Sequence, residues 1–204
     1  MQLSRERITK AALEILTGYG LADVSMRRVA SSLSVAPAAL YWHIANKQEL
    51  IAAMGLAIVQ PLIDDPLPHP ADLSRQLRDA VLGVRDGAEV LVAAMSQPDA
   101  EVRTVLADKF VEAVGAYTGS SSSDVRAAAL GMLHLTLGDA AVHQAGAQLA
   151  EATHGEHPTD DDAAALHEQA VGYLLDGLAA LGTEWTRMSF TGPLKAAMIT
   201  GQDR

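Results

Sequence analysis

Hydrophobic residues recur along this chain at intervals of three and four, which is the spacing of one face of an α-helix. In residues 4–20 this pattern gathers Ile8, Ala11, Ala12, Ile15 and Leu16 on one side. Ser4 is a favourable N-cap for that helix, and Gly18 and Gly20 favour its end. No stretch alternates apolar and polar residues over the length of a strand. The pattern therefore predicts an all-α fold.

Two short helices are expected next. Ser25 can cap a helix that turns Met26, Val29, Ala30 and Leu33 inward, and Pro37 suits the first turn of a third helix over residues 37–43. Two short helices joined by a tight turn form a helix-turn-helix, whose second helix enters the major groove of DNA. Residues 25–43 therefore predict a DNA-reading unit.

The rest of the chain predicts a connecting helix and a helical body. Asn46 and Glu49 resemble a capping box, so a fourth helix should begin there and end before Pro61. Three prolines in residues 66–70 predict a stiff connector, and residues 120–123 a flexible serine loop. Further helices are expected at residues 72–84, 88–95, 98–117, 124–149 and 162–181. The predicted organisation is a DNA-binding domain in residues 1–46, a connecting helix in 47–63 and an effector-binding and dimerisation domain in 71–204.

Charge is divided unevenly between these parts. The 204 residues carry a formal charge of −10, but residues 1–50 carry +2 and the remainder −12. A basic head on an acidic body is typical of a DNA-binding protein. The chain has no cysteine, which excludes disulfides and cysteine metal sites. Its amino terminus is polar and no long apolar segment occurs, so a cytoplasmic protein with no membrane partner is expected.

The first fifty residues closely resemble the DNA-binding domain of the tetracycline-repressor (TetR) family. The resemblance covers residues 3–54 and rests on RRVA at 27–30, LSV at 33–35, LYWH at 40–43 and NKQELI at 46–51. It implies three groups of DNA contacts: Ser25, Met26 and Arg27 near phosphates or base edges; Ala36, Pro37, Ala38 and Ala39 facing bases; and Tyr41, Trp42, His43 and Lys47 on the backbone. Because the base-facing positions lack polar side chains, readout should rely on Arg27, thymine methyl groups and DNA shape.

The body resembles the regulatory domain of the same family more weakly, through RDGAEV at residues 85–90 and LHLTLG at 133–138. The resemblance implies a ligand pocket in the body and a homodimer held by residues 124–149 and 162–181. The expected effector-binding residues are Leu91, Met95, His134, Thr136 and Val142. Leu91 and Val142 replace groups that would support a magnesium–tetracycline chelate, so the predicted effector is apolar and metal-free, oriented by His134 or Thr136.

Other functions fit less of the chain. His154 and His157, with Glu156 and Asp160 to Asp162, have the content of a metal site but lie in a polar segment typical of a solvated loop. His134 could equally be a core histidine. The chain has no catalytic motif, and neither an enzyme activity nor a cofactor is expected. The predicted function is a ligand-responsive repressor that binds a palindromic operator as a homodimer. The alternatives are a small all-α enzyme or ligand carrier, and an activator or architectural protein without an effector.

Overall fold

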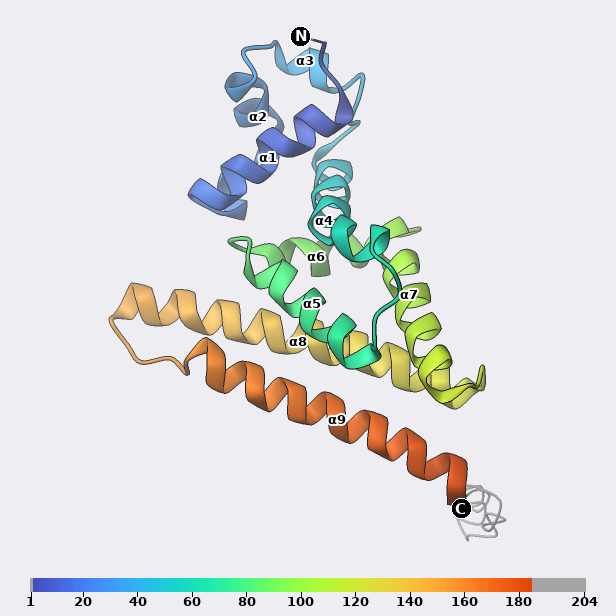
Figure 1. The fold of residues 1–204 in the computed structure, drawn as a ribbon. Coiled ribbons are helices and arrows are strands. Elements are labelled where there is room, and N and C mark those ends of the chain that lie inside the picture. Colours follow the sequence, from blue (N-terminus) through green and yellow to red (C-terminus); the bar gives the residue numbers. More distant parts are fainter. Residues whose placement is uncertain (1, 185–204) are drawn as a thin grey trace, which may run out of the picture.

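The computed structural model describes residues 2–184, and side chains up to residue 180 (Figure 1). Its regular structure in that range is entirely helical, which confirms the all-α prediction. The elements are α1 (Arg5–Tyr19), a 3-10 turn (Leu21–Asp23), α2 (Met26–Ser32), α3 (Pro37–Leu40), α4 (Lys47–Asp64), α5 (Pro70–Leu82), α6 (Gly87–Met95), α7 (Glu101–Thr118), α8 (Ser123–Thr153) and α9 (Asp160–Glu184).

Helices α1, α2 and α3 form a small head at one end of the molecule (Figure 1). Ser4 and Ser25 cap α1 and α2 as predicted, accepting hydrogen bonds from the backbone N–H groups of Arg7 and Arg28. The third helix is shorter than predicted and ends at Leu40. The carbonyl of Leu40 accepts from the N–H groups of both His43 and Ile44, so residues 41–43 form a tight turn instead of continuing the helix.

Helix α4 leads from the head into the body, and it continues through Pro61 to Asp64. The prediction that it ends before Pro61 was wrong. Proline removes one helical hydrogen bond, but only the last turn lies beyond it, and that turn is secured by other contacts. The ammonium of Lys109 donates to the carbonyls of Ile63 at 3.2 Å and Asp65 at 2.7 Å, which satisfies groups at the helix end.

The body consists of α5 to α9, with α8 and α9 running antiparallel at the end opposite the head (Figure 1). Helix α7 begins at Glu101, three residues later than predicted, because Asp99 adopts a left-handed conformation with φ of 53°. Helices α8 and α9 are longer than predicted. The predicted range 71–204 extends beyond the described residues.

Helix α8 is the one described helix whose length and composition would allow it to cross a membrane. This is weak evidence, since a core helix of a globular body meets the same criteria. The inner face of α8 is buried against the body, with Ala129, Met132 and Ala140 fully covered. We therefore interpret α8 as the central helix of the body.

Candidate DNA interface and effector site

With one exception, the predicted DNA-contacting residues are exposed or half-buried on the head and at the start of α4. Tyr41 is 53% exposed and Trp42 is 89% exposed, a degree of exposure that is unusual for such large apolar side chains. The buried neighbours Leu40 and Ile44 anchor the turn between them. The remaining exposed members of the predicted set are Ser25, Arg27, Ala36, Pro37, Ala38, His43 and Lys47, with Ala39 half-buried. This arrangement leaves an aromatic and basic surface free to contact a ligand.

Met26 is the exception within the predicted set. Its side chain is 8% exposed and belongs to the core of the head, so it contributes packing and offers little surface to DNA. The two adjacent arginines also differ. Arg28 pairs with Asp23 and lies 4.1 Å over the ring of Tyr19, whereas Arg27 is exposed. The polar readout expected from this helix therefore depends on Arg27.

The amino terminus of α4 is fixed by a modified capping box. The Asn46 side chain accepts from the Glu49 N–H at 2.8 Å, and the Glu49 carboxylate accepts from the Ala45 N–H at 2.6 Å. Glu49 also pairs with Arg5 on α1. The Ala45 hydrogen bond first, and then Arg5, lower the pKa of Glu49. The pair joins the starts of α1 and α4, and it leaves Lys47 exposed where a helix N-terminus attracts phosphate.

The predicted effector-binding residues are not brought together. Leu91, Met95 and Thr136 are buried, at 0%, 8% and 0% exposure. Val142 is 76% exposed and His134 is also exposed, so both lie on the outer surface of α8 in the protomer. His134 is therefore neither a core histidine nor close to the buried group. The reason is helical phase, since residues 134 and 142 face away from the side of α8 that carries Thr136.

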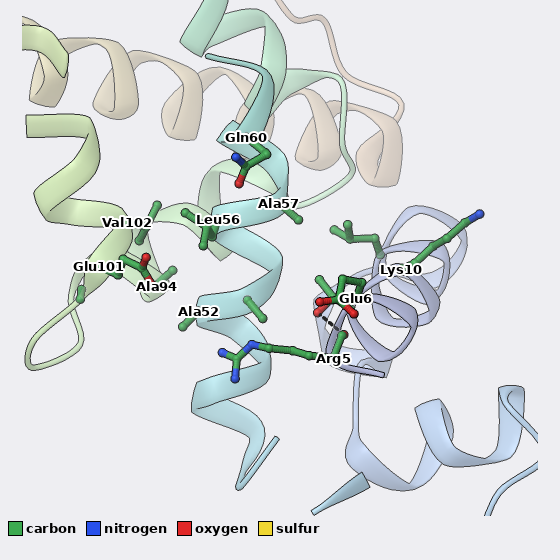
Figure 2. A pocket seen from close by; sticks show the side chains of 14 residues that line it. Arg5, Glu6, Lys10, Ala52, Leu56, Ala57, Gln60, Ala94, Glu101 and Val102 are labelled. Atoms are coloured by element: carbon green, nitrogen blue, oxygen red, sulfur yellow. Dashed lines mark hydrogen bonds between the residues drawn. The ribbon is translucent and has the colours of Figure 1, made fainter. Parts of the chain in front are cut away.

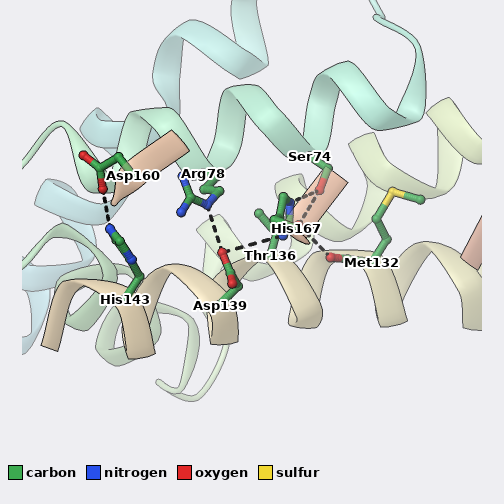
Figure 3. A network of polar contacts seen from close by, with 8 residues as sticks. All are labelled: Ser74, Arg78, Met132, Thr136, Asp139, His143, Asp160 and His167. Atoms are coloured by element: carbon green, nitrogen blue, oxygen red, sulfur yellow. Dashed lines mark hydrogen bonds and ion pairs between the residues drawn. The ribbon is translucent and has the colours of Figure 1, made fainter. Parts of the chain in front are cut away.

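Thr136 instead joins a buried polar cluster that the sequence reading did not identify. The cluster consists of Ser74 and Arg78 on α5, Thr136 and Asp139 on α8, and His167 on α9 (Figure 3). Ser74 Oγ lies 2.5 Å from Thr136 Oγ1 and 3.0 Å from His167 Nε2. Arg78 Nε donates to Asp139 Oδ2 at 2.8 Å. One signal in the sequence could have indicated this cluster. Arg78 is a charged residue on the same face of α5 as the apolar Leu77 and Val81.

Two buried polar atoms of this cluster have no hydrogen-bond partner among the residues that the structure describes. They are Nη2 of Arg78, whose side chain is 4% exposed, and Nδ1 of His167, whose side chain is 2% exposed. His167 Nδ1 lies 3.7 Å from Asp139 Oδ2. Burial lowers the pKa of His167; Asp139 opposes this shift, and the nearby Arg78 adds to it. The imidazole is therefore neutral near pH 7.

A groove of about 830 Å³ lies between α1 of the head and helices α4 and α7 (Figure 2). Its walls are mostly small or apolar, including Leu13, Leu56 and Val102, and its margins carry Arg5, Glu6, Lys10 and Glu101. Head and body are therefore not packed tightly along this side. The hydrogen bond that ties them on the opposite end of α1 joins the Leu21 N–H to Asp86 Oδ2 at 2.7 Å.

The histidine- and aspartate-rich segment between α8 and α9 packs against His143 of α8. His143 pairs with Asp160 and packs edge-on against His157, with ring centroids 4.6 Å apart. Across residues 2–184, no group of three or more histidine or acidic side chains is placed to hold a metal ion.

A helix-turn-helix head with an exposed basic and aromatic surface, carried on a helical body, defines a DNA-binding regulator. The model of bacterial regulatory proteins of the tetR family matches residues 8–54. The tetracycline repressor protein class C of Escherichia coli is 30% identical over 164 residues, which cover 74% of this chain and 70% of that protein. The class D repressor of Escherichia coli is 33% identical over 97 residues, so this match spans 44% of its length.

Solved structures extend the likeness to the body. Mycobacterium smegmatis BioQ is 34% identical with a TM-score of 0.75, over 88% of this chain and 99% of that chain. BioQ with its double-stranded DNA operator is also 34% identical, with a TM-score of 0.69 over 88% of this chain and 99% of that chain. The chain belongs to the tetR family of bacterial transcriptional regulators.

Proposed function

We propose that this regulator is a homodimeric repressor that binds a near-palindromic operator and is released by a small-molecule effector. The observation that carries the proposal is the continuity of α4. This helix begins at the DNA-facing surface of the head and ends in the body, so one rigid element joins both functions. Support for operator binding comes from the likeness to BioQ, which has been solved with its operator.

Homodimerisation is supported by two seams of small and apolar residues at the surface of α8 and α9. On α8, six small or apolar residues follow one another at steps of three and four: Gly131, Leu135, Gly138, Val142, Ala145 and Leu149. Leu135 is half-buried and the other five are exposed. On α9 the same steps connect Leu166, Ala170, Tyr173 and Gly177, of which Ala170 is half-buried and the others are exposed. This is the spacing of a helix-packing seam. A second copy of the chain carries identical seams and covers them in an isologous interface.

Coupling between body and head is supported by tight packing between α4 and α6. A Cβ atom placed on Gly55 would lie 2.7 Å from the Cβ of Ala94, so these helices touch where Gly55 has no side chain. Displacement of α6 by an effector would therefore move α4. In a dimer this changes the separation of the two heads, which must match successive major grooves.

The test is operator footprinting by the full-length protein, with and without fractionated cell metabolites. An inducible repressor gives a symmetric footprint that a metabolite fraction abolishes. About 100-fold release requires the effector to prefer the non-binding state by about 2.7 kcal/mol. A footprint that persists with every fraction would favour a constitutive DNA-bound protein, and recovery of only asymmetric sites from random DNA would contradict the dimer.

A further inference from the structure

We propose that the groove between head and body binds the effector, and that this effector is a neutral, largely apolar molecule of drug-like size. The inference rests on the proposed function, and it names the site and the chemistry of the ligand. The groove measures about 830 Å³. Sites for small organic ligands in proteins measure about 300–1,000 Å³ and are mostly apolar.

The groove has its floor on α4 and a wall on each side, with α1 of the head on one side and the start of α7 on the other (Figure 2). The floor carries Ala52, Leu56 and Ala57, which are half-buried. Leu13 stands on the α1 wall and Val102 on the α7 wall. The short alanine side chains leave the floor hollow. A molecule in the groove therefore contacts the head and the body at once.

The groove also reaches the contact that couples α6 to α4. Ala94 of α6 belongs to the lining, and its Cβ would lie 2.7 Å from a Cβ atom placed on Gly55 of α4. A ligand that presses on Ala94 therefore acts at the position where α6 and α4 touch. This gives the effector a direct mechanical connection to the helix that carries the head.

The lining offers a ligand few hydrogen bonds. The hydroxyl of Thr9 donates to the Arg5 carbonyl at 2.9 Å, and the amide of Gln60 donates to Asp64 at 2.8 Å. The backbone groups of the floor are bonded within α4. Binding free energy must therefore come mainly from covering apolar surface, which favours an apolar ligand.

The charges at the margins do not favour an ion of either sign. The lining contains two acidic residues, Glu6 and Glu101, and two basic ones, Arg5 and Lys10. Arg5 pairs with Glu49, and Lys10 points away from α4 (Figure 2). Glu101 lies in the first turn of α7, where the helix dipole stabilises an acid. A charged ligand would lose its hydration against apolar walls without gaining a dedicated partner, so a neutral ligand fits best.

The first experiment titrates N-phenyl-1-naphthylamine, a neutral apolar dye, into the full-length protein and follows methyl groups by NMR. Leu13, Leu56 and Val102 should shift saturably with one dissociation constant, because one molecule touches the floor and both walls. Val111, which lines a separate hollow between α7 and α8, should not shift. Shifts at Val111 without shifts at the three groove residues, or no saturable shift at all, would overturn the site.

The charge preference is tested with 8-anilinonaphthalene-1-sulfonate, which carries a sulfonate on the same ring system. It should bind about tenfold more weakly than the neutral dye, since the sulfonate must give up water beside apolar walls. Equal or tighter binding of the sulfonate would overturn the neutral class of ligand.

The second experiment fills the groove. Ala57→Phe should weaken binding of the neutral dye by about tenfold or more, because its ring occupies the floor. Ala147→Phe makes the same change at an exposed position of α8 that does not line the groove, and it should leave dye binding unchanged. Unchanged binding in a folded Ala57→Phe protein would contradict the proposal, and the methyl shifts of the natural chain decide the site independently of this variant.

The last experiment tests the effector role. On the operator recovered by footprinting, the affinity for the neutral dye should change by about fivefold or more, because binding at the groove and at DNA are linked through the head. An unchanged dye affinity would overturn the effector role. Dye binding to the free protein does not depend on DNA, so failure of the groove is distinguishable from failure of the proposed function.

Discussion

The proposed dimer seam on α8 can be tested by placing a large side chain at Gly138. A Cβ atom at Gly138 would meet nothing within 4 Å among the described residues, and the position is exposed, so we expect Gly138→Leu to leave the packing within one chain intact. Replacing an exposed helical glycine should even stabilise the isolated protomer by roughly 0.8 kcal/mol, because glycine disfavours helix. Any loss of assembly in this variant therefore originates between chains.

The expected size follows from symmetry. Overpacking a close contact costs about 1–3 kcal/mol per site, and a two-fold interface contains the substitution twice. The dimer should weaken by about 2–6 kcal/mol, which is roughly 30-fold to more than 10⁴-fold in the dissociation constant. Operator affinity should fall with it, because a single head contacts one half-site.

Sedimentation velocity from nanomolar to micromolar concentration measures this shift, and circular dichroism verifies that helicity is retained. Ala147→Leu provides the matched control. It places the same side chain on the same helix nine residues later, which is on the opposite side of α8, at another exposed position. If Gly138→Leu dimerises as tightly as the natural chain, the seam is not the interface and the assignment of α8 to dimerisation fails.

Three further outcomes are expected. Lys47→Ala should reduce the slope of log affinity against log salt by about two for a dimer, measured by fluorescence anisotropy; an unchanged slope would remove Lys47 from the phosphate contacts. Because burial places the folded-state pKa of His167 below the unfolded value of 6.5, the unfolded chain binds more protons just below pH 6.5. Stability should therefore fall on acidification through that window, and urea unfolding should show a smaller fall in His167→Gln. Asp86→Ala should speed hydrogen exchange at the Leu21 amide, which donates to Asp86, without changing helicity; exchange as slow as in the natural chain would show that this bond does not hold the head.

Local signals predicted most of the fold. The caps at Ser4, Ser25 and Asn46 were visible because an N-cap depends on residues within one turn. The end of α4 could not be predicted locally. The residue that stabilises it beyond Pro61 is Lys109, which lies 46 residues from Ile63 and 44 residues from Asp65 in the sequence. The left-handed residue Asp99, which delays α7, also has no distinctive local signal.

The two candidate sites were predictable to different degrees. The DNA-contacting surface of the head could be predicted because it is encoded in a short, specific motif. Among its predicted residues, Met26 differs from the prediction because its side chain is buried. The body cluster joins three helices separated by up to 93 residues between Ser74 and His167, so its members become neighbours only in the fold. The sequence analysis named Thr136 as an effector-binding residue together with His134 and Val142. In the structure Thr136 lies on the buried face of α8, whereas His134 and Val142 lie on its exposed face.

Helix α8 provides a physical route between that cluster and the head. Gln144 holds the turn before α6, since its amide donates to the Val84 carbonyl at 2.8 Å and its oxygen accepts from the Ala88 N–H at 3.1 Å. One turn further, Gln148 donates to Asp86 Oδ1, while Asp86 Oδ2 accepts from the head. At 1.5 Å per residue, these contacts lie about 12–18 Å along the same helix from Thr136. A displacement of α8 near the cluster would therefore reach the turn that contacts the head, in parallel with the α6–α4 contact. The contacts of α8 and α6 thus give two routes by which a displacement in the body would reach a head that otherwise borders an open groove.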